Sequence, residues 1–223
     1  MFGTNNLICI AGKNKCSIDF VKYISSKIPK KQILILPNKT DKSKDSWQPS
    51  LRKYAKKNNY KIVRLEELYN IDELIFISIE YESIIKTKKF KWKKLYNFHF
   101  SLLPKYRGCH TNFFQILNGE KKSGVTLHEI DDGIDTGPII DNIKFEIKKN
   151  TNAFMNYLIL MRYSLKLLKK NFHKILKNNY KKRIQLLNKG SYFSRTSVNY
   201  KEINNFNINK INKNELNIKI ENI

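Results

Sequence analysis

One segment of the chain concentrates the residue types that acid–base chemistry needs. It runs from Asn97 to Asp135 and reads NFHFSLLPKYRGCHTNFFQILNGEKKSGVTLHEIDDGID. Asn97 and His99 are two residues apart, so in an extended strand their side chains point to the same face. Pro104 lacks a backbone donor and Gly108 permits a turn, which places the pair where a strand ends and a loop begins. That end of an α/β sheet is where active sites lie.

An amide donor beside an imidazole suits a reaction in which an oxyanion develops and a proton moves at neutral pH. A carboxylate that orients the imidazole would complete the set, and by position Asp131, Asp132 and Asp135 all qualify. An isolated Asn-x-His pair is more often structural, because buried His and Asn commonly just satisfy backbone groups. The neighbouring motifs must therefore decide between the two interpretations.

With SLLP, GVT and GIDTG nearby, the pair closely resembles the catalytic core of the 10-formyltetrahydrofolate-dependent formyltransferases. In that family the carboxylate lies between the glycines, so the resemblance selects Asn97, His99 and Asp135 as the catalytic residues. It implies that Asn97 donates to the oxyanion and that His99 moves a proton or adds positive charge. Asp135 would orient the imidazole and order a water.

The same resemblance implies 10-formyltetrahydrofolate as the formyl donor, with no metal. The pterin would lie beside the sheet, against the strand and loop before Asn97 and against the loop that carries Asp135. The cofactor-binding residues expected from this placement are Phe76, Ser78, Tyr81, Glu82, Ile130, Asp132 and Gly133.

Three branches of the family differ in the amine that they formylate. The methionyl-tRNA branch carries a further C-terminal domain of roughly a hundred residues, whereas only a helix and a short tail follow Ile147 here. The glycinamide ribonucleotide branch, of purine synthesis, generally has a G-x-G-S-N loop where this chain has AGKN, and it is our alternative. The sugar-nucleotide branch is similar to this chain from about residue 7 to residue 200, including AGKN, WQPSL and GSYFSR.

This last resemblance implies an N-formyltransferase acting on a dTDP-linked amino-dideoxysugar, such as dTDP-4-amino-4,6-dideoxyglucose, for O-antigen or other lipopolysaccharide biosynthesis. A homodimer is expected. Lys13 and Asn14 lie at the start of a helix whose N-terminus suits a diphosphate. A loop of this kind, taken alone, more often simply connects a strand to a helix. Trp47 would border the nucleotide or anchor packing. The expected substrate-binding residues are Lys13, Asn14, Trp47, Tyr106, His110, Tyr192 and Arg195.

The composition argues against several other classes of protein. The net charge is +24, which would favour a nucleic-acid or membrane-surface partner. The excess is mostly Lys spread along the chain, however, and Arg, which reads phosphates and bases best, is not clustered. There is no run of about 18 apolar residues and no secretory signal, and the three cysteines form no C-x-x-C pair. We expect a cytoplasmic protein with no nucleic-acid partner, no membrane span and no zinc site.

Short apolar runs, typical of buried strands, alternate along the chain with apolar residues at helical spacing. This alternation predicts the elements that must position the site. They indicate an α/β, Rossmann-like core: a mixed, mostly parallel sheet with helices on both faces. Beyond it we expect a long amphipathic helix capped by Thr151 or Asn152, then a hairpin or irregular strands over 185–200. Residues 1–180 would form the catalytic domain and residues 181–223 a C-terminal hairpin and tail. The expected strands lie at 7–11, 32–36, 62–65, 74–79, 97–100, 125–130 and 139–147, and a helix at 111–117.

Overall fold

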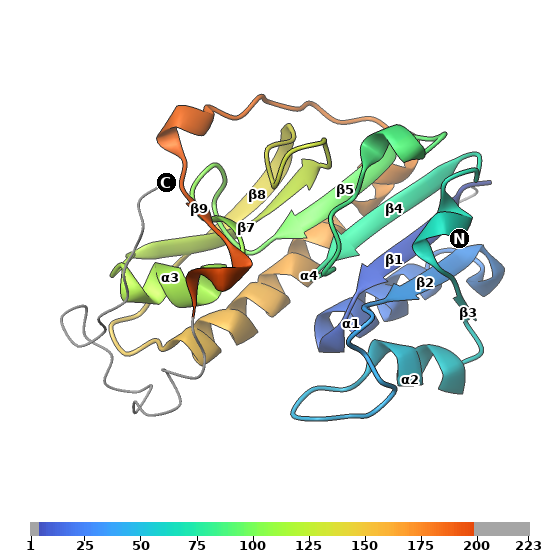
Figure 1. Cartoon of the computed structure of the whole chain (residues 1–223), viewed down its shortest axis with the longest axis horizontal. Helices are drawn as coiled ribbons and strands as arrows, with labels where there is room; N and C mark the ends of the chain where they lie inside the picture. Colours follow the sequence, from blue (N-terminus) through green and yellow to red (C-terminus); the bar gives the residue numbers. More distant parts are fainter. Residues whose placement is uncertain (1–4, 199–223) are drawn as a thin grey trace.

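A seven-stranded sheet forms the centre of the protein (Figure 1). The computed structural model describes residues 5–198. Across the sheet the strands follow in the order β3 (Lys61–Ile62), β2 (Ile33–Pro37), β1 (Leu7–Gly12), β4 (Leu74–Ile79), β5 (Lys94–His99), β7 (Lys122–Glu129) and β8 (Ile139–Glu146). The first five run parallel, and β7 and β8 are antiparallel. This mixed, mostly parallel sheet confirms the predicted α/β fold.

The central parallel strands β1, β2 and β4 are almost entirely apolar because both of their faces are covered. β2 and β4 are buried along their whole length. One face packs against α1 (Asn14–Ser25), α2 (Leu51–Lys57) and α4 (Ala153–Lys177) in the larger apolar core. The opposite face is covered by connections that contain only the 3-10 turns η2 (Leu65–Leu68) and η3 (Thr87–Lys89).

Among the residues that the structure describes, the helices predicted on both faces therefore lie on one face. The two connections that cover the other face are on the order of a dozen residues long, close to the minimum for a parallel crossover. So short a connection spans the sheet with turns instead of a full helix. For the same reason the strand predicted over 62–65 covers only Lys61–Ile62, and η2 begins at Leu65.

The long helix α4 confirms the predicted amphipathic helix and its cap. Asn152 Oδ1 accepts a hydrogen bond from Met155 N (2.8 Å), and Asn178 ends the helix in a left-handed conformation. Leu160, Leu168 and Phe172 on its inner face are fully buried. No helix within residues 5–198 has the length and apolar character to cross a membrane.

After α4 the chain runs back across the molecule toward α3 (Thr111–Leu117), drawn in orange to red in Figure 1. There β9 (Tyr192–Phe193) pairs in parallel with β6 (Arg107–Gly108), so these strands form a small sheet of their own. Among the described residues, the segment predicted as a hairpin thus pairs with the loop after β5 and not with itself. Residues 199–223 of the predicted tail lie outside the described residues, and the predicted division at residue 180 stays a prediction.

Candidate active site

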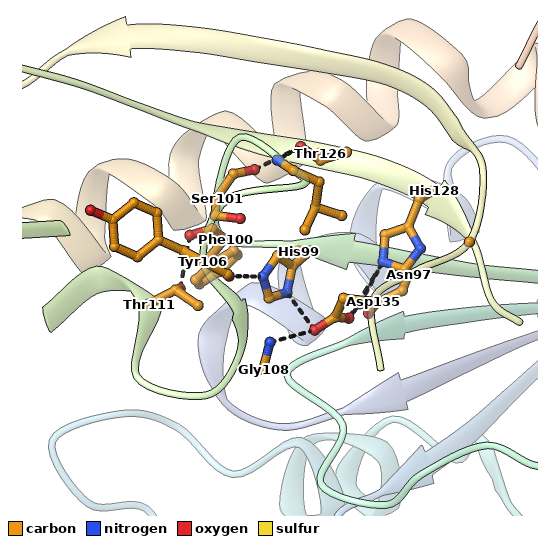
Figure 2. Close-up of polar contacts among 12 residues, drawn as sticks. Asn97, His99, Phe100, Ser101, Tyr106, Gly108, Thr111, Thr126, His128 and Asp135 are labelled. Carbon is orange, nitrogen blue, oxygen red and sulfur yellow. Dashed lines mark hydrogen bonds and ion pairs between the residues drawn. The ribbon is translucent and has the colours of Figure 1, made fainter. Parts of the chain in front are cut away.

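The three residues predicted to be catalytic lie together at the end of β5 (Figure 2). Asn97 and His99 are on β5, and Asp135 is on the loop between β7 and β8. Asn97 Nδ2 donates to Asp135 Oδ1 across 3.1 Å, and His99 Nδ1 lies 3.4 Å from Asp135 Oδ2. An amide, an imidazole and a carboxylate from two separate segments therefore form one contiguous cluster.

The other two acidic residues of the loop have structural contacts of their own. Asp131 Oδ1 accepts hydrogen bonds from Gly133 N (3.2 Å) and Thr136 Oγ1 (2.7 Å). Asp132 Oδ1 accepts from Thr87 Oγ1 (2.6 Å) and so joins this loop to the connection after β4. Of the three candidate carboxylates, only Asp135 reaches the imidazole in this geometry.

Asp135 is held as an anion. Burial by itself would raise the pKa of this carboxyl group, because the charged form loses hydration. The charge of His99, the neighbouring His128 ring and the hydrogen bond from Gly108 N (2.8 Å) together outweigh burial and hold the pKa of Asp135 well below its ordinary value. An anion fixed in this way suits the orientation of an imidazolium better than the uptake of a proton.

The His99 ring is fixed at both nitrogens. Nε2 lies 2.6 Å from the carbonyl oxygen of Tyr106, and a carbonyl only accepts, so Nε2 carries a hydrogen. Nδ1 faces the Asp135 carboxylate. An imidazolium, which carries a hydrogen on each nitrogen, satisfies both neighbours at once.

His128 is a member of the cluster that the sequence interpretation missed. It pairs directly with Asn97 across β5 and β7, and it is 2% exposed. Its Nδ1 lies 2.7 Å from Glu129 O and therefore donates, which leaves Nε2 to accept from Asn97 Nδ2 at 3.1 Å. Asn97 thus directs both amide hydrogens inward, to His128 and Asp135. The available signal was the position of His128 in GVTLH, but only the strand register places it beside Asn97.

The GVT segment shapes the loop after β5. Thr126 Oγ1 donates to Ser101 O (2.7 Å) and accepts from Leu103 N (3.2 Å), so β7 holds the start of the SLLP turn. At Gly124 a Cβ atom would collide with the backbone of Ile143 and with the Leu102 side chain. These residues therefore position the catalytic strand end and carry no chemistry of their own.

A second polar cluster lies at the same edge of the sheet. Glu80 follows β4 directly, one residue beyond Ile79, which forms the last pair of β4 with β5 at Phe98. Both carboxylate oxygens of Glu80 lie 2.8 Å from Tyr157 Oη on α4. Burial raises the pKa of Glu80, although the Lys13 charge and the Tyr157 hydroxyl oppose that shift.

Two further side chains donate to the same hydroxyl. Gln48 Nε2 lies 2.9 Å and Asn14 Nδ2 lies 3.5 Å from Tyr157 Oη. With both of these donating, the hydroxyl hydrogen is free to go to Glu80. The sequence interpretation missed Glu80 and Tyr157, because the loop, the strand and the helix that meet here are far apart in the chain.

The residues predicted to bind the cofactor separate into two groups. Phe76 and Ser78 are buried in β4, Phe76 packs against Tyr81, and the Glu82 carboxylate bonds Thr40 Oγ1 (2.7 Å). Ile130 and Asp132 line a cavity of about 580 Å³ between the Asp135 loop and the connection after β4. The other lining residues are Thr87, Trp92, Lys93, Lys94, Leu95, Glu129, Asp131, Asn178, Tyr180 and Lys182. Gly133 lies on the same loop as Ile130 and Asp132.

Within residues 5–198, no group of His, Cys, Asp and Glu is placed to hold a metal ion.

Of the residues predicted to bind the substrate, Lys13, Asn14 and Trp47 lie near Glu80. Lys13 acts on the Glu80 charge, and the Trp47 ring, 66% exposed, lies 5.9 Å from that of Tyr157. These three residues and the Glu80 pair therefore occupy one region of the sheet edge.

The predicted substrate residues from the later part of the chain lie around the β6–β9 pair. The Tyr106 ring is buried, stacked on Phe193 and bonded to Glu120 Oε1, so only its backbone carbonyl reaches His99. His110 Nε2 bonds Arg195 O (3.0 Å). Arg195 Nη2 donates to Glu82 O (2.8 Å), and Tyr192 is 40% exposed. In this structure the Tyr106 side chain packs in a small core, and its predicted contact with the substrate stays a prediction.

Comparison with known proteins places the chain in a family. A model described as formyl transferase matches residues 5–156, more than half of the chain. The chain belongs to the formyltransferase family. Members of this family are enzymes that transfer formyl groups, which confirms the predicted class. The bifunctional polymyxin resistance protein ArnA of Wigglesworthia glossinidia brevipalpis is 34% identical over 60% of the chain. The match spans only 21% of that protein, and 29% of a methionyl-tRNA formyltransferase from Kosmotoga olearia.

Two solved structures of sugar formyltransferases cover most of the chain. WlaRD, a sugar 3N-formyltransferase crystallised in the presence of dTDP and 5-N-formyl-THF, is 47% identical. The match has a TM-score of 0.84 and covers 88% of this chain and 72% of WlaRD. The N-formyltransferase of Helicobacter canadensis, in complex with folinic acid and dTDP-3-aminofucose, is 45% identical, with a TM-score of 0.84 and coverages of 86% and 72%. A glycinamide ribonucleotide transformylase from Symbiobacterium toebii, 12% identical with a TM-score of 0.61 and coverages of 82% and 94%, shares the fold alone.

Proposed function

We propose that this formyltransferase moves a formyl group from 10-formyltetrahydrofolate to the 3-amino group of a dTDP-linked amino-dideoxysugar, in surface-glycan biosynthesis. The observation that carries the reaction is the convergence of Asn97, His99 and Asp135 at the end of β5. The similarity to WlaRD and to the H. canadensis enzyme favours the dTDP-sugar, and the 3-amino position over the 4-amino example considered from sequence.

In this reaction the amine nitrogen attacks the formyl carbon, and the carbonyl π electrons move onto oxygen. The tetrahedral intermediate then expels the folate N10, which takes up the proton that the incoming nitrogen loses. An imidazolium at His99, held between Tyr106 O and the Asp135 anion, stabilises the oxyanion through its positive charge. The net change is one N–C bond formed and one broken, with no oxidant or metal required.

The structure changes the role that we assign to Asn97. Both of its amide hydrogens go to His128 Nε2 and Asp135 Oδ1, and the carboxylate fixes the orientation, since a reversed amide would set oxygen against oxygen. Its carbonyl oxygen is then the atom that accepts from the attacking amine. Such a contact aims the nitrogen lone pair at the formyl carbon, which is an effect of orientation.

The folate and the sugar nucleotide are assigned to different elements around the cluster. Ile130, Asp132 and Gly133 lie on the loop that carries Asp135, and this loop is assigned to the pterin. The cavity that Ile130 and Asp132 line lies beside Lys94 and Leu95 at the start of β5, and none of Asn97, His99 and Asp135 lines it. Lys13 and Asn14 belong to the Glu80 side, where a helix N-terminus favours a diphosphate. On that side Glu80 and Tyr157 are hydrogen-bonding groups for the amino sugar itself, because Glu80 follows the end of β4, which pairs with the end of β5, and Tyr157 contacts Glu80.

A donor-dependent product assay tests this assignment. Purified protein and 10-formyltetrahydrofolate are incubated together with one acceptor in each reaction: a dTDP-3-amino sugar, a dTDP-4-amino sugar or glycinamide ribonucleotide. The masses of the products are measured by mass spectrometry. We expect a gain of one formyl group, fastest on the 3-amino sugar, and none with Asn97→Ala, His99→Ala or Asp135→Ala protein that remains folded. Formylation of glycinamide ribonucleotide alone would instead establish the purine-synthesis alternative. The O-antigen role and the homodimer stay predictions.

A further inference from the structure

Within residues 5–198, the Gln185 side chain from the segment after α4 hydrogen-bonds the loop that carries Asp135. Arg183 and Ile139 exchange two backbone hydrogen bonds of 2.8 and 2.9 Å, which anchor this segment beside β8. Two residues later Gln185 is 6% exposed, whereas Ile184 on one side is 86% exposed and Leu186 on the other is 60% exposed. The extended backbone therefore turns Gln185 inward, and its apolar neighbours outward.

Both amide hydrogens of Gln185 are used on the catalytic loop. Nε2 donates to the backbone oxygen of Asp135 (3.0 Å) and to that of Gly137 (2.7 Å). Oε1 of the same amide is buried and has no hydrogen-bond partner within residues 5–198. An amide that leaves its own acceptor unpaired in order to donate twice is oriented by those two carbonyl groups.

The Asp135 loop needs an external restraint. Asp135 has a φ of 53°, in the left-handed region that a residue with a Cβ atom disfavours. Gly137 packs so closely that a Cβ atom there would collide with the backbone of Glu129. If the Asp135 backbone relaxed, its carboxylate would leave both Asn97 and His99, which it contacts at 3.1 and 3.4 Å.

We propose that Gln185 is a positioning residue for formyl transfer: its amide fixes the backbone of Asp135, so that the carboxylate stays on Asn97 and His99. Gln185 lies outside the segment that matches the family model, which ends at residue 156. The inference rests on the proposed formyl transfer but not on which amine accepts the group.

The test compares Gln185→Ala and the isosteric Gln185→Glu with a matched control, Ile184→Ala, whose side chain is exposed next to it in sequence. Each rate is measured with 10-formyltetrahydrofolate and the acceptor that wild-type protein formylates, and folding is checked by thermal unfolding. We expect kcat to fall by about ten- to a hundredfold in both Gln185 variants, the range that a displacement of about 1 Å produces. The control should stay within about twofold of wild type.

A double-mutant cycle separates positioning from general support of the fold. Gln185→Ala is combined with Asp135→Asn, and the two residual rates in that background are compared. Because Gln185 acts through the Asp135 carboxylate, its removal should change the already reduced rate by less than about twofold. An equal loss in both backgrounds, or an unchanged kcat in the single variants, would overturn the proposal. Gln185→Glu covers the case in which Gln185→Ala does not fold. Failure of wild-type protein to formylate any acceptor would count against the proposed function and not against this assignment.

Discussion

Asn97→Asp probes the electrostatics of the cluster most directly. The substitution keeps the shape of the side chain but sets an oxygen where Nδ2 stood, 3.1 Å from Asp135 Oδ1. Two ionised carboxylates at that distance repel by about 5 kcal/mol at an effective dielectric constant of about 20. The folded variant therefore takes up a proton, which either the carboxylate pair shares or His128 Nε2 holds.

The size of the effect depends on pH, because the unfolded chain does not hold that proton above its ordinary titration range. One extra proton in the folded state lowers the free energy of unfolding by up to about 1.4 kcal/mol for each unit of rising pH. Between pH 5 and pH 8 this amounts to about 4 kcal/mol at most. The positive charge of His99 offsets part of this effect. We therefore expect the free energy of unfolding of Asn97→Asp to fall by about 2–4 kcal/mol between pH 5 and pH 8.

Urea denaturation of Asn97→Asp and Asn97→Ala at pH 5 and pH 8 measures this difference, since the alanine variant lacks the second carboxylate. Relative to Asn97→Ala, the aspartate variant should be the less stable at pH 8 and should recover as the pH falls. Activity should be lost in both. If the two variants showed the same dependence on pH, the amide nitrogen of Asn97 would not face the Asp135 carboxylate, and the assigned roles would be wrong.

Three further perturbations address the neighbours of this pair. Glu80→Gln keeps an acceptor for the Tyr157 hydroxyl and removes a partly buried charge, so the variant should be at least as stable as wild type at pH 7 in thermal unfolding, yet formylate the sugar more slowly. His128→Phe keeps a ring but removes the acceptor of Asn97 Nδ2, and kcat should fall by about ten- to a hundredfold without loss of fold by circular dichroism. Asp135→Asn should destabilise the protein in urea near pH 7, with a difference from wild type that shrinks below about pH 4, where the unfolded carboxyl group begins to take up its proton.

The cluster of Asn97, His99 and Asp135, which we propose to be catalytic, was predictable because each residue carries a local signal. Asn97 and His99 share a strand face through the period of two, and the glycines around Asp135 mark the family loop. His128 and Gln185 have no such signal. They reach the cluster only through the pairing of β5 with β7 and through the bridge between Arg183 and Ile139, both of which join distant parts of the chain.

Misplaced side chains have the same cause. The sequence put Tyr106 on the loop after the catalytic strand, which is correct, but nothing local shows that its ring turns into the small core with Phe193. Likewise β4 was located correctly while the environment of Glu80, one residue beyond it, depends on Tyr157 from α4. Periodicity predicts which face a residue occupies, and tertiary contacts decide what it meets there.

Glu80 and Asp135 both carry carboxylates at this sheet edge, but their surroundings shift the two pKa values in opposite directions. Both lose hydration, which raises the pKa of each. At Asp135 two imidazoles and a backbone amide more than reverse the shift, so its ionised form stabilises the fold above the unfolded pKa, and that contribution is lost as pH falls toward the folded pKa. At Glu80 a hydroxyl and a more distant Lys13 charge do not reverse it, so ionisation opposes folding as pH rises above the unfolded pKa. Asp135→Asn and Glu80→Gln should therefore change stability in opposite directions at neutral pH. A change of the same sign in both would mean that the charges around Glu80 neutralise it as fully as the imidazoles neutralise Asp135.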